Sequence, residues 1–203
     1  MSSIARAALL VVIAGGIGLT FWLLAPNQPS LPDNSISMND AHIMTLTSTA
    51  FNEGGVIPTK YTCDGENINP PFLISDVPEG VVSLSLLADD PDIPQVFKDQ
   101  RGIDSFDHWT LFNIDPSISV IGEGEMPGTA GVNSAGNLVY TGPCPPTEYE
   151  PTEHRYFFKI YALDTQLNLP EGATKAEVLA AMEGHIIAEA QIMGVYDRAG
   201  GGE

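Results

Sequence analysis

The longest apolar stretch of the sequence lies close to its N-terminus. Residues 7–25 (AALLVVIAGGIGLTFWLLA) are nineteen positions without a charged side chain, and a helix of that length would span about 28 Å, close to the hydrocarbon thickness of a bilayer. The stretch is longer than the apolar part of a typical signal peptide, and Pro26 follows where a cleavage site needs small residues. We therefore expect residues 1–25 to form a retained membrane anchor, with a cleaved signal peptide and a buried soluble helix as alternatives.

The residues around this stretch predict the side of the membrane on which the rest of the chain lies. Arg6 precedes the stretch, whereas Asp33 and Asp40 follow it, and basic residues favour the cytoplasmic side. Residues 26–41 are rich in Pro, Asn and Ser, which is typical of a linker. We expect residues 42–203 to form one extracytoplasmic domain, periplasmic or extracellular, which is secreted if the signal is cleaved.

After the linker the pattern changes to short apolar segments separated by Gly and Pro. Three of these segments are rich in β-branched or aromatic residues and have the length of strands. They are residues 81–88 (VVSLSLLA), 109–114 (WTLFNI) and 156–163 (YFFKIYAL). Such segments, bounded by turn residues, predict a mainly antiparallel β-sandwich.

A helical pattern appears only near the C-terminus. Thr174 and Glu177 have the spacing of a capping box, and apolar residues then recur at helical spacing as far as Gly194. These apolar residues are Val178, Leu179, Met182, Ile186 and Ile187. With Gly184 as a point of division, we expect C-terminal helices packed on the sheet. The predicted fold class is mainly β, an antiparallel β-sandwich with C-terminal helices, preceded by one N-terminal transmembrane helix.

Charge and composition exclude several classes of function. The chain has 26 Asp and Glu against 8 Lys and Arg, a formal net charge of -18. Nucleic-acid binding needs clustered basic residues that contact phosphates, so we expect no nucleic-acid partner. Two cysteines are too few for a disulfide-dense scaffold or a four-thiolate zinc site. A hydrophobic content of 43% is typical of a globular protein.

Three loops concentrate residue types that are unusual in the turns of a β-domain. Residues 89–94 (DDPDIP) combine three carboxylates with two prolines, although an ordinary Asp-capped turn has the same composition. Residues 107–109 (DHW) place His108 at the start of a strand, where it is either a structural or a functional histidine. Residues 140–146 (YTGPCPP) precede residues 154–156 (HRY); their Gly and Pro predict a rigid wall in which a cis X-Pro bond is allowed.

These loops carry a resemblance to a known family. The segments are DPDIP at 90–94, HW at 108–109, GPCPP at 142–146 and HRY at 154–156, supported by YTCDGENINPP at 61–71, YALD at 161–164 and GVY at 194–196. In this order they resemble the phosphatidylethanolamine-binding protein family, and most of all its bacterial and archaeal branch, the Raf kinase inhibitor-like YbhB/YbcL proteins. The similarity covers about residues 46–198.

The resemblance implies a β-sandwich with a small surface pocket that binds anions such as a phosphate head group. The residues that it places in the pocket are Asp90, His108, Gly142, Cys144, Pro145, Pro146 and His154. Residues 95–107 correspond to a variable loop beside the pocket and offer no aligned ligand residue. The N-terminal anchor is not part of the family's core pattern, and no cofactor is implied.

The residue types themselves fit an anion site and limit how it works. With a net charge of -18 the protein does not steer an anion from a distance, so attraction must come from the two histidines and from backbone N–H groups of the Gly-Pro loop. An imidazole becomes cationic near pH 6.5 or below, and Asp90 between two rings would orient one of them and favour its protonation. We expect a non-enzymatic module that binds small anions weakly, and more tightly as the pH falls from 8 to 6.

Two other classes of function remain open from the sequence. Asp90, His108 and His154, with Cys144 as a fourth ligand, are a set that suits a metal-dependent or acid–base hydrolase. The sequence has no HExxH pair and no G-x-S-x-G nucleophile motif, which argues against the hydrolase. We therefore expect neither catalysis nor a bound metal. A protease- or kinase-inhibitor-type interaction module is the other class, in which the acidic surface and residues 95–107 engage a protein partner.

Cys63 and Cys144 are the two cysteines of the chain. Outside the cytoplasm they are free to form a disulfide, and two buried free thiols are the alternative. Closing a loop of about 80 residues stabilises a fold by about 4 kcal/mol in the chain-entropy model.

Three further side chains are assigned structural roles. Arg155 follows His154 and is expected to point to the other side of its strand, where Asp92 is a candidate ion-pair partner. His42, at the edge of the linker, and His185, near a predicted helix start, are expected to be structural or solvated.

Overall fold

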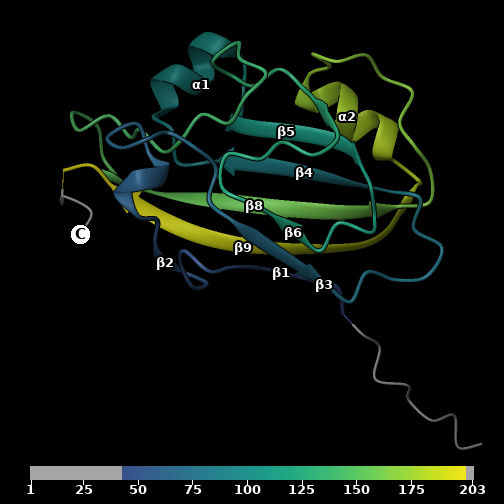
Figure 1. The fold of residues 1–203 in the computed structure, drawn as a ribbon. Helices are drawn as coiled ribbons and strands as arrows, with labels where there is room; N and C mark the ends of the chain where they lie inside the picture. Colours follow the sequence, from purple (N-terminus) through teal and green to yellow (C-terminus); the bar gives the residue numbers. More distant parts are fainter. Residues whose placement is uncertain (1–42, 200–203) are drawn as a thin grey trace, which may run out of the picture. The chain divides into compact units, whose positions relative to one another are not determined.

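The computed structural model describes residues 43–199, which form two β-sheets and two short helices. The larger sheet has the strand order β2-β9-β8-β4-β5-β7 and the smaller one the order β1-β3-β6. Pairing between the named strands is antiparallel, except that β2 and β9 run parallel. Figure 1 shows α1 and α2 above the larger sheet, with β1 and β3 below it.

The elements have the following bounds along the chain. The strands are β1 Thr45–Ser48, β2 Gly55–Val56, β3 Phe72–Ser75, β4 Ser83–Asp90, β5 Phe106–Ile114, β6 Val120–Ile121, β7 Thr129–Ala130, β8 Glu153–Leu163 and β9 Ile186–Asp197; the helices are α1 Gln95–Arg101 and α2 Lys175–Met182, with a 3-10 turn at Thr59–Tyr61. The prediction of a mainly antiparallel sandwich is consistent with these elements.

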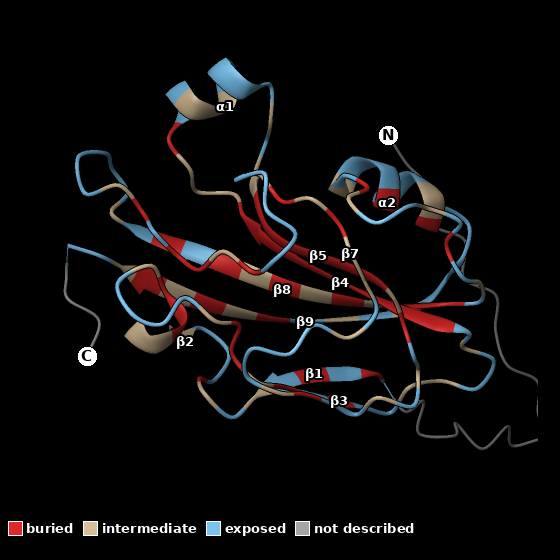
Figure 2. Ribbon diagram, turned by 45° about the horizontal axis from the view of Figure 1, so that its top comes forward, coloured by how far each residue is buried: buried red, intermediate tan, exposed pale blue. Residues whose placement is uncertain are grey.

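The core explains why β4 is apolar along its whole length. All eight of its residues are buried, because Leu84, Leu86 and Ala88 face the space between the two sheets while Leu87 faces the cluster under α2. In Figure 2 β4 and β5 are red almost throughout, whereas β8 is banded because it alternates buried and more exposed residues. A strand that is covered on both faces loses the polar alternation of a half-exposed strand.

The three strands predicted from the apolar segments are present. Strands β5 and β8 begin three residues earlier than expected, and β4 has the expected length but lies two residues further along the chain. Strand β4 extends to Asp90, β5 begins at Phe106, and β8 begins at Glu153. The polar residues at these ends break the apolar pattern, so the sequence did not assign them to strands. They are nevertheless paired in the sheet: Asp89 pairs with Asp107, and Asp90 pairs with Phe106. The candidate carboxylate and histidines, Asp90, His108 and His154, therefore lie on strand ends and not in free loops.

The C-terminal region corrects the prediction of a second helix. Helix α2 begins with the predicted capping box, in which Thr174 and Glu177 bond to each other reciprocally, and it buries Val178 and Met182. It ends before Gly184, whose φ is 80°. Ile186 and Ile187, which match helical spacing, instead open β9, because the residues after them pair with β8 along almost all of its length. Sheet pairing outweighs the local helical spacing here.

The prediction of one transmembrane helix, and with it the predicted location at a membrane, also needs correction. Within residues 43–199, helices α1 and α2 have 7 and 8 residues, and none of the helices there is long and apolar enough to cross a bilayer. The stretch 7–25, on which that prediction rests, lies outside the described residues, as does the predicted linker. The fold class that the structure supports is mainly β with two helices.

Candidate functional site

Three strand ends meet at one end of the larger sheet. Because β4 lies antiparallel to both β5 and β8, its C-terminal end is next to the N-terminal ends of its two neighbours. Asp90 closes β4, His108 is the third residue of β5, and His154 is the second residue of β8. These three side chains are buried, with exposed fractions of 3%, 6% and 0%. The topology thus gathers one carboxylate and two imidazoles that are far apart in the sequence.

The carboxylate of Asp90 fixes the ring of His154. Nδ1 of His154 lies 2.7 Å from Oδ2 of Asp90, a hydrogen bond in which the ring nitrogen donates to the carboxylate. The other oxygen of Asp90, Oδ1, accepts from the backbone N–H of Asp92 at 2.8 Å. Nε2 of His154 is buried and has no hydrogen-bond partner. The ring is therefore oriented through one nitrogen, and the other is left for a ligand.

A backbone carbonyl group fixes the ring of His108. Its Nδ1 lies 2.6 Å from the carbonyl oxygen of Thr141, and since a carbonyl only accepts, this nitrogen carries a hydrogen. Its Nε2 has no hydrogen-bond partner and lies 3.9 Å from Oδ2 of Asp90, which is too long for a hydrogen bond. Tyr156 packs against both imidazoles, with ring centroids 5.2 Å from His108 and 6.4 Å from His154. Both rings are held in place, each with Nε2 unpaired.

The Gly-Pro loop that forms the opposite wall is fastened to the segment around Cys63. The backbone N–H of Gly142 donates to Oδ1 of Asn67 at 2.8 Å, and a Cβ at Gly142 would lie 2.4 Å from the carbonyl oxygen of Tyr61, so only glycine allows this approach. Cys63 and Cys144 are joined in a disulfide. The cis X-Pro bond lies at Glu150–Pro151, after the GPCPP run.

These parts enclose a pocket of about 100 Å³, called here the histidine pocket. All seven residues that the resemblance implied line it, together with three that it did not name: Asp90, His108, Gly142, Cys144, Pro145, Pro146 and His154, with Ile93, Phe106 and Thr141. Phe106 lies two residues before His108 on the same strand, so the two-residue period of a strand was a signal for it. The role of Thr141 depends on its carbonyl group, which no side-chain pattern reveals.

The electrostatics of the histidine pocket favour a charged Asp90. Burial alone would raise the pKa of this carboxyl, but the imidazoles of His108 and His154 outweigh that effect and lower it. Next to it, Asp92 accepts from Nε and Nη2 of Arg155 at 2.8 and 2.7 Å, as expected from the sequence, and the guanidinium lowers the pKa of Asp92. The turn that contains Asp90 and Asp92 is thus held by two consecutive residues of β8, because His154 bonds to Asp90 and Arg155 bonds to Asp92.

The arrangement offers little support for a metal centre. Among residues 43–199 no group of three or more His, Cys, Asp or Glu is placed to hold a metal ion. Cys144 has its sulfur in a disulfide, so it has no thiolate to act as the fourth ligand that the hydrolase hypothesis requires.

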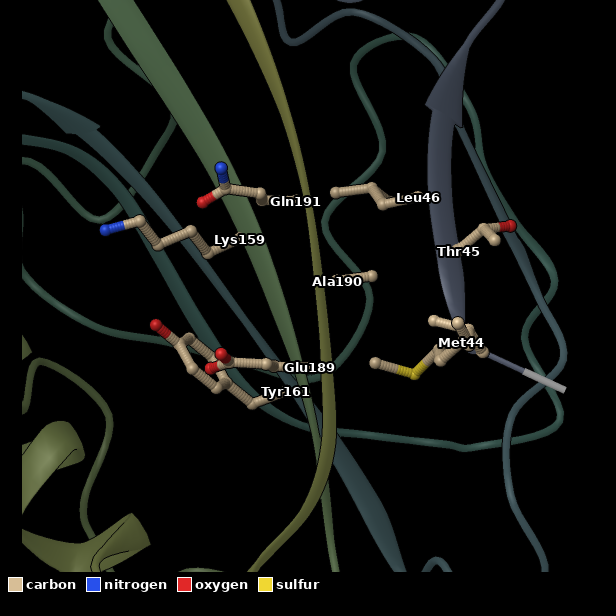
Figure 3. Close-up of a pocket in the computed structure, with 9 residues that line it drawn as sticks. Met44, Thr45, Leu46, Lys159, Tyr161, Glu189, Ala190 and Gln191 are labelled. Carbon is tan, nitrogen blue, oxygen red and sulfur yellow. The ribbon is translucent and has the colours of Figure 1, made fainter. Parts of the chain in front are cut away.

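A larger hollow lies elsewhere, between β1 and the strands β8 and β9. It measures about 540 Å³, and Figure 3 shows Met44 and Leu46 directed towards β9 while Thr45 points away. The polar residues that line it include Lys159, whose Nζ lies 3.4 Å from Oδ2 of Asp89. None of its lining residues is a histidine or a buried polar residue without a partner. It lacks the fixed, unpaired imidazole nitrogens that distinguish the histidine pocket.

A β-sandwich with a small polar pocket at one end of its larger sheet has the architecture of a ligand-binding module, and comparison with known proteins shows which kind. The sequence model of the family described as phosphatidylethanolamine-binding protein matches residues 47–197. A UPF0098 protein of Methanothermobacter thermautotrophicus is 46% identical over 162 residues, which cover 76% of this chain and 99% of that protein. The chain belongs to the phosphatidylethanolamine-binding protein family, and the resemblance seen in the sequence is confirmed.

Solved structures agree with this assignment. A crystal structure of a putative phosphatidylethanolamine-binding protein homologue from Chlamydia trachomatis matches with a TM-score of 0.71 and 44% identity, covering 77% of this chain and 99% of that one. The structure of Escherichia coli YbcL, described as a new member of the mammalian family, matches with a TM-score of 0.66 and 28% identity, covering 76% of this chain and 98% of that one. Fold and family together support a binding module like those of this family.

Proposed function

We propose that the protein is a non-catalytic module that binds a small anion, such as the phosphate of a head group, in the histidine pocket. The observation that carries the proposal is the pair of buried imidazoles, each pinned through Nδ1 and each with Nε2 unpaired. Buried polar atoms without partners are rare in native proteins, so these two nitrogens are the natural contacts for a ligand. A protonated Nε2 donates a charge-assisted hydrogen bond to an anionic oxygen.

The residues that line the histidine pocket offer little for covalent catalysis. The sulfur of Cys144 is oxidised in the disulfide, and the hydroxyl oxygen of Thr141 already accepts from the side chain of Asn133 at 2.9 Å. His154 and Asp90 form a pair like that of an acid–base site, but such a pair needs a nucleophile or bound water to act on a substrate. Orientation of a ligand is the role that the pair serves in this proposal.

The pH dependence of binding tests this function directly. An anion needs donors, and because Nδ1 carries the hydrogen of the neutral ring, Nε2 of either histidine donates only when the ring is protonated, a form that a lower pH favours. We expect sulfate, whose charge is constant in this range, to bind about tenfold more tightly at pH 6 than at pH 8 in titration calorimetry. Methyl phosphate should show the same direction.

Variants assign the effect to the histidine pocket. His108→Gln and His154→Gln should each weaken sulfate binding at pH 6 and flatten its pH dependence. His185→Gln is the matched control, because His185 is exposed and bonds to Asp164 instead. Equal or weaker binding of sulfate at pH 6 than at pH 8 would contradict the proposal, as would a loss of binding in His185→Gln alone.

A further inference from the structure

A second, more apolar pocket adjoins the histidine pocket. It measures about 230 Å³ and is called here the α1 pocket. The two pockets share Ile93, Phe106, Cys144 and Pro146, and the α1 pocket adds Pro94, Phe97, Arg101 and Ile103. A molecule that enters the histidine pocket with one end has this apolar surface next to its other end.

Helix α1 forms one wall of this pocket and is attached loosely to the domain. None of its residues is buried, and Val96 has an exposed fraction of 40%. Phe97 meets the ring of Tyr149 edge-on at 5.6 Å, and Nζ of Lys98 donates to the carbonyl oxygen of Pro91 at 2.6 Å. A helix usually stays folded by burying an apolar face. The partly exposed Phe97 is therefore apolar surface that a ligand can cover.

The distribution of ion pairs leaves positive charge beside this pocket. Five of the seven basic residues between 43 and 199 pair with a carboxylate: Lys60, Arg155, Lys159, Lys175 and Arg198. The two that have no such partner within this part of the chain, Lys98 and Arg101, both lie on α1. Arg101 makes one long contact, from Nη1 to the carbonyl oxygen of Ser134 at 3.3 Å, and its guanidinium carbon lies 6.0 Å from the centre of the Phe106 ring.

In a chain with a formal charge of -18, carboxylates outnumber basic groups more than threefold, so an unpaired arginine is unexpected. Its position on the wall of the α1 pocket places it where a bound ligand can supply a counter-charge that residues 43–199 do not. An apolar surface and a free guanidinium together suit an organic anion. They suit inorganic phosphate less well, because that ion would leave the apolar surface bare.

We propose that the ligand is an organic phosphate whose apolar or aromatic group lies directly next to its phosphate. The phosphate occupies the histidine pocket, the apolar group lies in the α1 pocket against Phe97, and Arg101 adds positive charge at the exposed side. This inference rests on the proposed anion-binding function. It adds a class of ligand, and it gives a role to a segment that has no ligand residue by resemblance to the family.

Three phosphates and one neutral compound separate the contributions of the two pockets. Titration calorimetry at pH 6 would compare phenyl phosphate, methyl phosphate, inorganic phosphate and phenol. Burial of a phenyl ring against the α1 pocket should make phenyl phosphate bind about tenfold more tightly than methyl phosphate. Phenol should bind at least about a hundredfold more weakly than phenyl phosphate, because it lacks the charged group.

Variants on α1 locate the apolar group. Phe97→Ala should abolish most of the tenfold advantage of phenyl phosphate and leave methyl phosphate binding unchanged, which also shows that the variant is folded. Val96→Ala is the matched control, because Val96 is on the same helix but does not line the pocket. Arg101→Ala should weaken both organic phosphates about threefold or more, whereas Lys60→Ala, which removes a charge paired with Glu123, should change neither.

The outcomes distinguish this inference from the function on which it rests. Equal affinities for phenyl and methyl phosphate, both dependent on His108 and His154, would overturn the inference and leave the anion-binding function in place. Binding of phenyl phosphate that is lost in Phe97→Ala but unchanged in His108→Gln and His154→Gln would overturn the anion-binding function. No detectable binding of any phosphate would overturn both.

Discussion

Asp90 and Asp107 show how two buried carboxyl groups in one protein acquire opposite properties. Both are nearly inaccessible, with exposed fractions of 3% and 5%. The pKa of Asp90 is lowered because two imidazoles outweigh the effect of burial. Burial raises the pKa of Asp107 to about 6, because the hydroxyl of Thr110 and the charge of Lys175 compensate for it only in part. Oδ1 of Asp107 has no hydrogen-bond partner.

This difference predicts that Asp107 destabilises the fold at neutral pH. An aspartate titrates near pH 4 when unfolded, so between about pH 4 and pH 6 the folded state holds a proton that the unfolded state has lost. Stability therefore falls as the pH rises through this window, by about 2–3 kcal/mol from this group. In Asp107→Asn the group does not titrate. The free energy of unfolding of Asp107→Asn minus that of wild type should therefore increase by that amount between pH 4 and pH 7.

Urea denaturation at a series of pH values measures this difference. Asp104→Asn, an exposed residue of the same segment, controls for the loss of one negative charge. A difference between Asp107→Asn and wild type that is constant from pH 4 to pH 7 would contradict the assignment of a raised pKa. Because Asp107 also lies near His108, the same variant shows whether its titration contributes to the pH dependence of sulfate binding.

At this scale the sequence was informative about identity and uninformative about geometry. Asp90, His108 and His154 were identified through motifs, and the pairing of Arg155 with Asp92 followed from the alternation of side chains along a strand. That His154 and not His108 bonds directly to Asp90 depends on ring-nitrogen to Oδ2 distances of 2.7 and 3.9 Å, a difference that no sequence pattern reveals. Arg101 was missed because its significance lies in having no carboxylate partner among residues 43–199, which only the assembled structure shows.

At the scale of elements, the wall of the histidine pocket depends on one loop docking against another. The backbone N–H of Cys63 donates to the carbonyl oxygen of Pro143 at 3.1 Å, and the hydroxyl of Tyr140 donates to the backbone carbonyl oxygen of Tyr61 at 3.1 Å. With the disulfide from Cys63 to Cys144, these bonds join segments 81 residues apart in the sequence. The position of the GPCPP run therefore depends on the segment around Cys63.

Removal of the disulfide should weaken both the fold and the site. In the chain-entropy model a link across 81 residues stabilises the folded state by about 4 kcal/mol. The variant Cys63→Ser with Cys144→Ser should unfold at lower denaturant concentration by a corresponding amount, and it should bind sulfate more weakly at pH 6 because the wall is less constrained.

A thiol count decides whether the link exists in the protein. The denatured, unreduced protein should contain no titratable thiol, and the reduced protein should contain two. Two thiols without reductant would contradict the disulfide. Unchanged stability of the double variant would instead show that the native hydrogen bonds alone hold the two loops together.

The elements also show where sequence patterns are reliable. The buried strands β4 and β5 and the capping box of α2 were predicted because each depends on local residues. Strand β9 was not, because its early residues Ile186 and Ile187 match helical spacing and are exposed; its identity comes from pairing with β8, a distant segment. Helix α1 has no buried face, so it left no periodic signal in the sequence.

At the scale of the whole molecule, the net charge opposes the proposed ligand. A formal charge of -18 repels an approaching anion over long distances, whereas the histidines and Arg101 act only at short range. Added salt weakens the two effects unequally, because the Debye length falls from about 30 Å at 0.01 M to about 8 Å at 0.15 M. The long-range repulsion is largely screened at 0.15 M, and contacts within the pocket are not.

We therefore expect sulfate to bind more tightly as ionic strength rises, in contrast to ordinary ion pairing between a protein and its ligand. Between 0.01 M and 0.15 M sodium gluconate, the affinity at pH 6 should rise roughly two- to threefold. Glu171→Gln with Glu189→Gln, both exposed positions, reduces the repulsion and should strengthen binding at low salt more than at high salt. An affinity that falls with salt would mean that local positive charge from Arg101 and Lys98 determines the field at the pocket and that the overall charge does not.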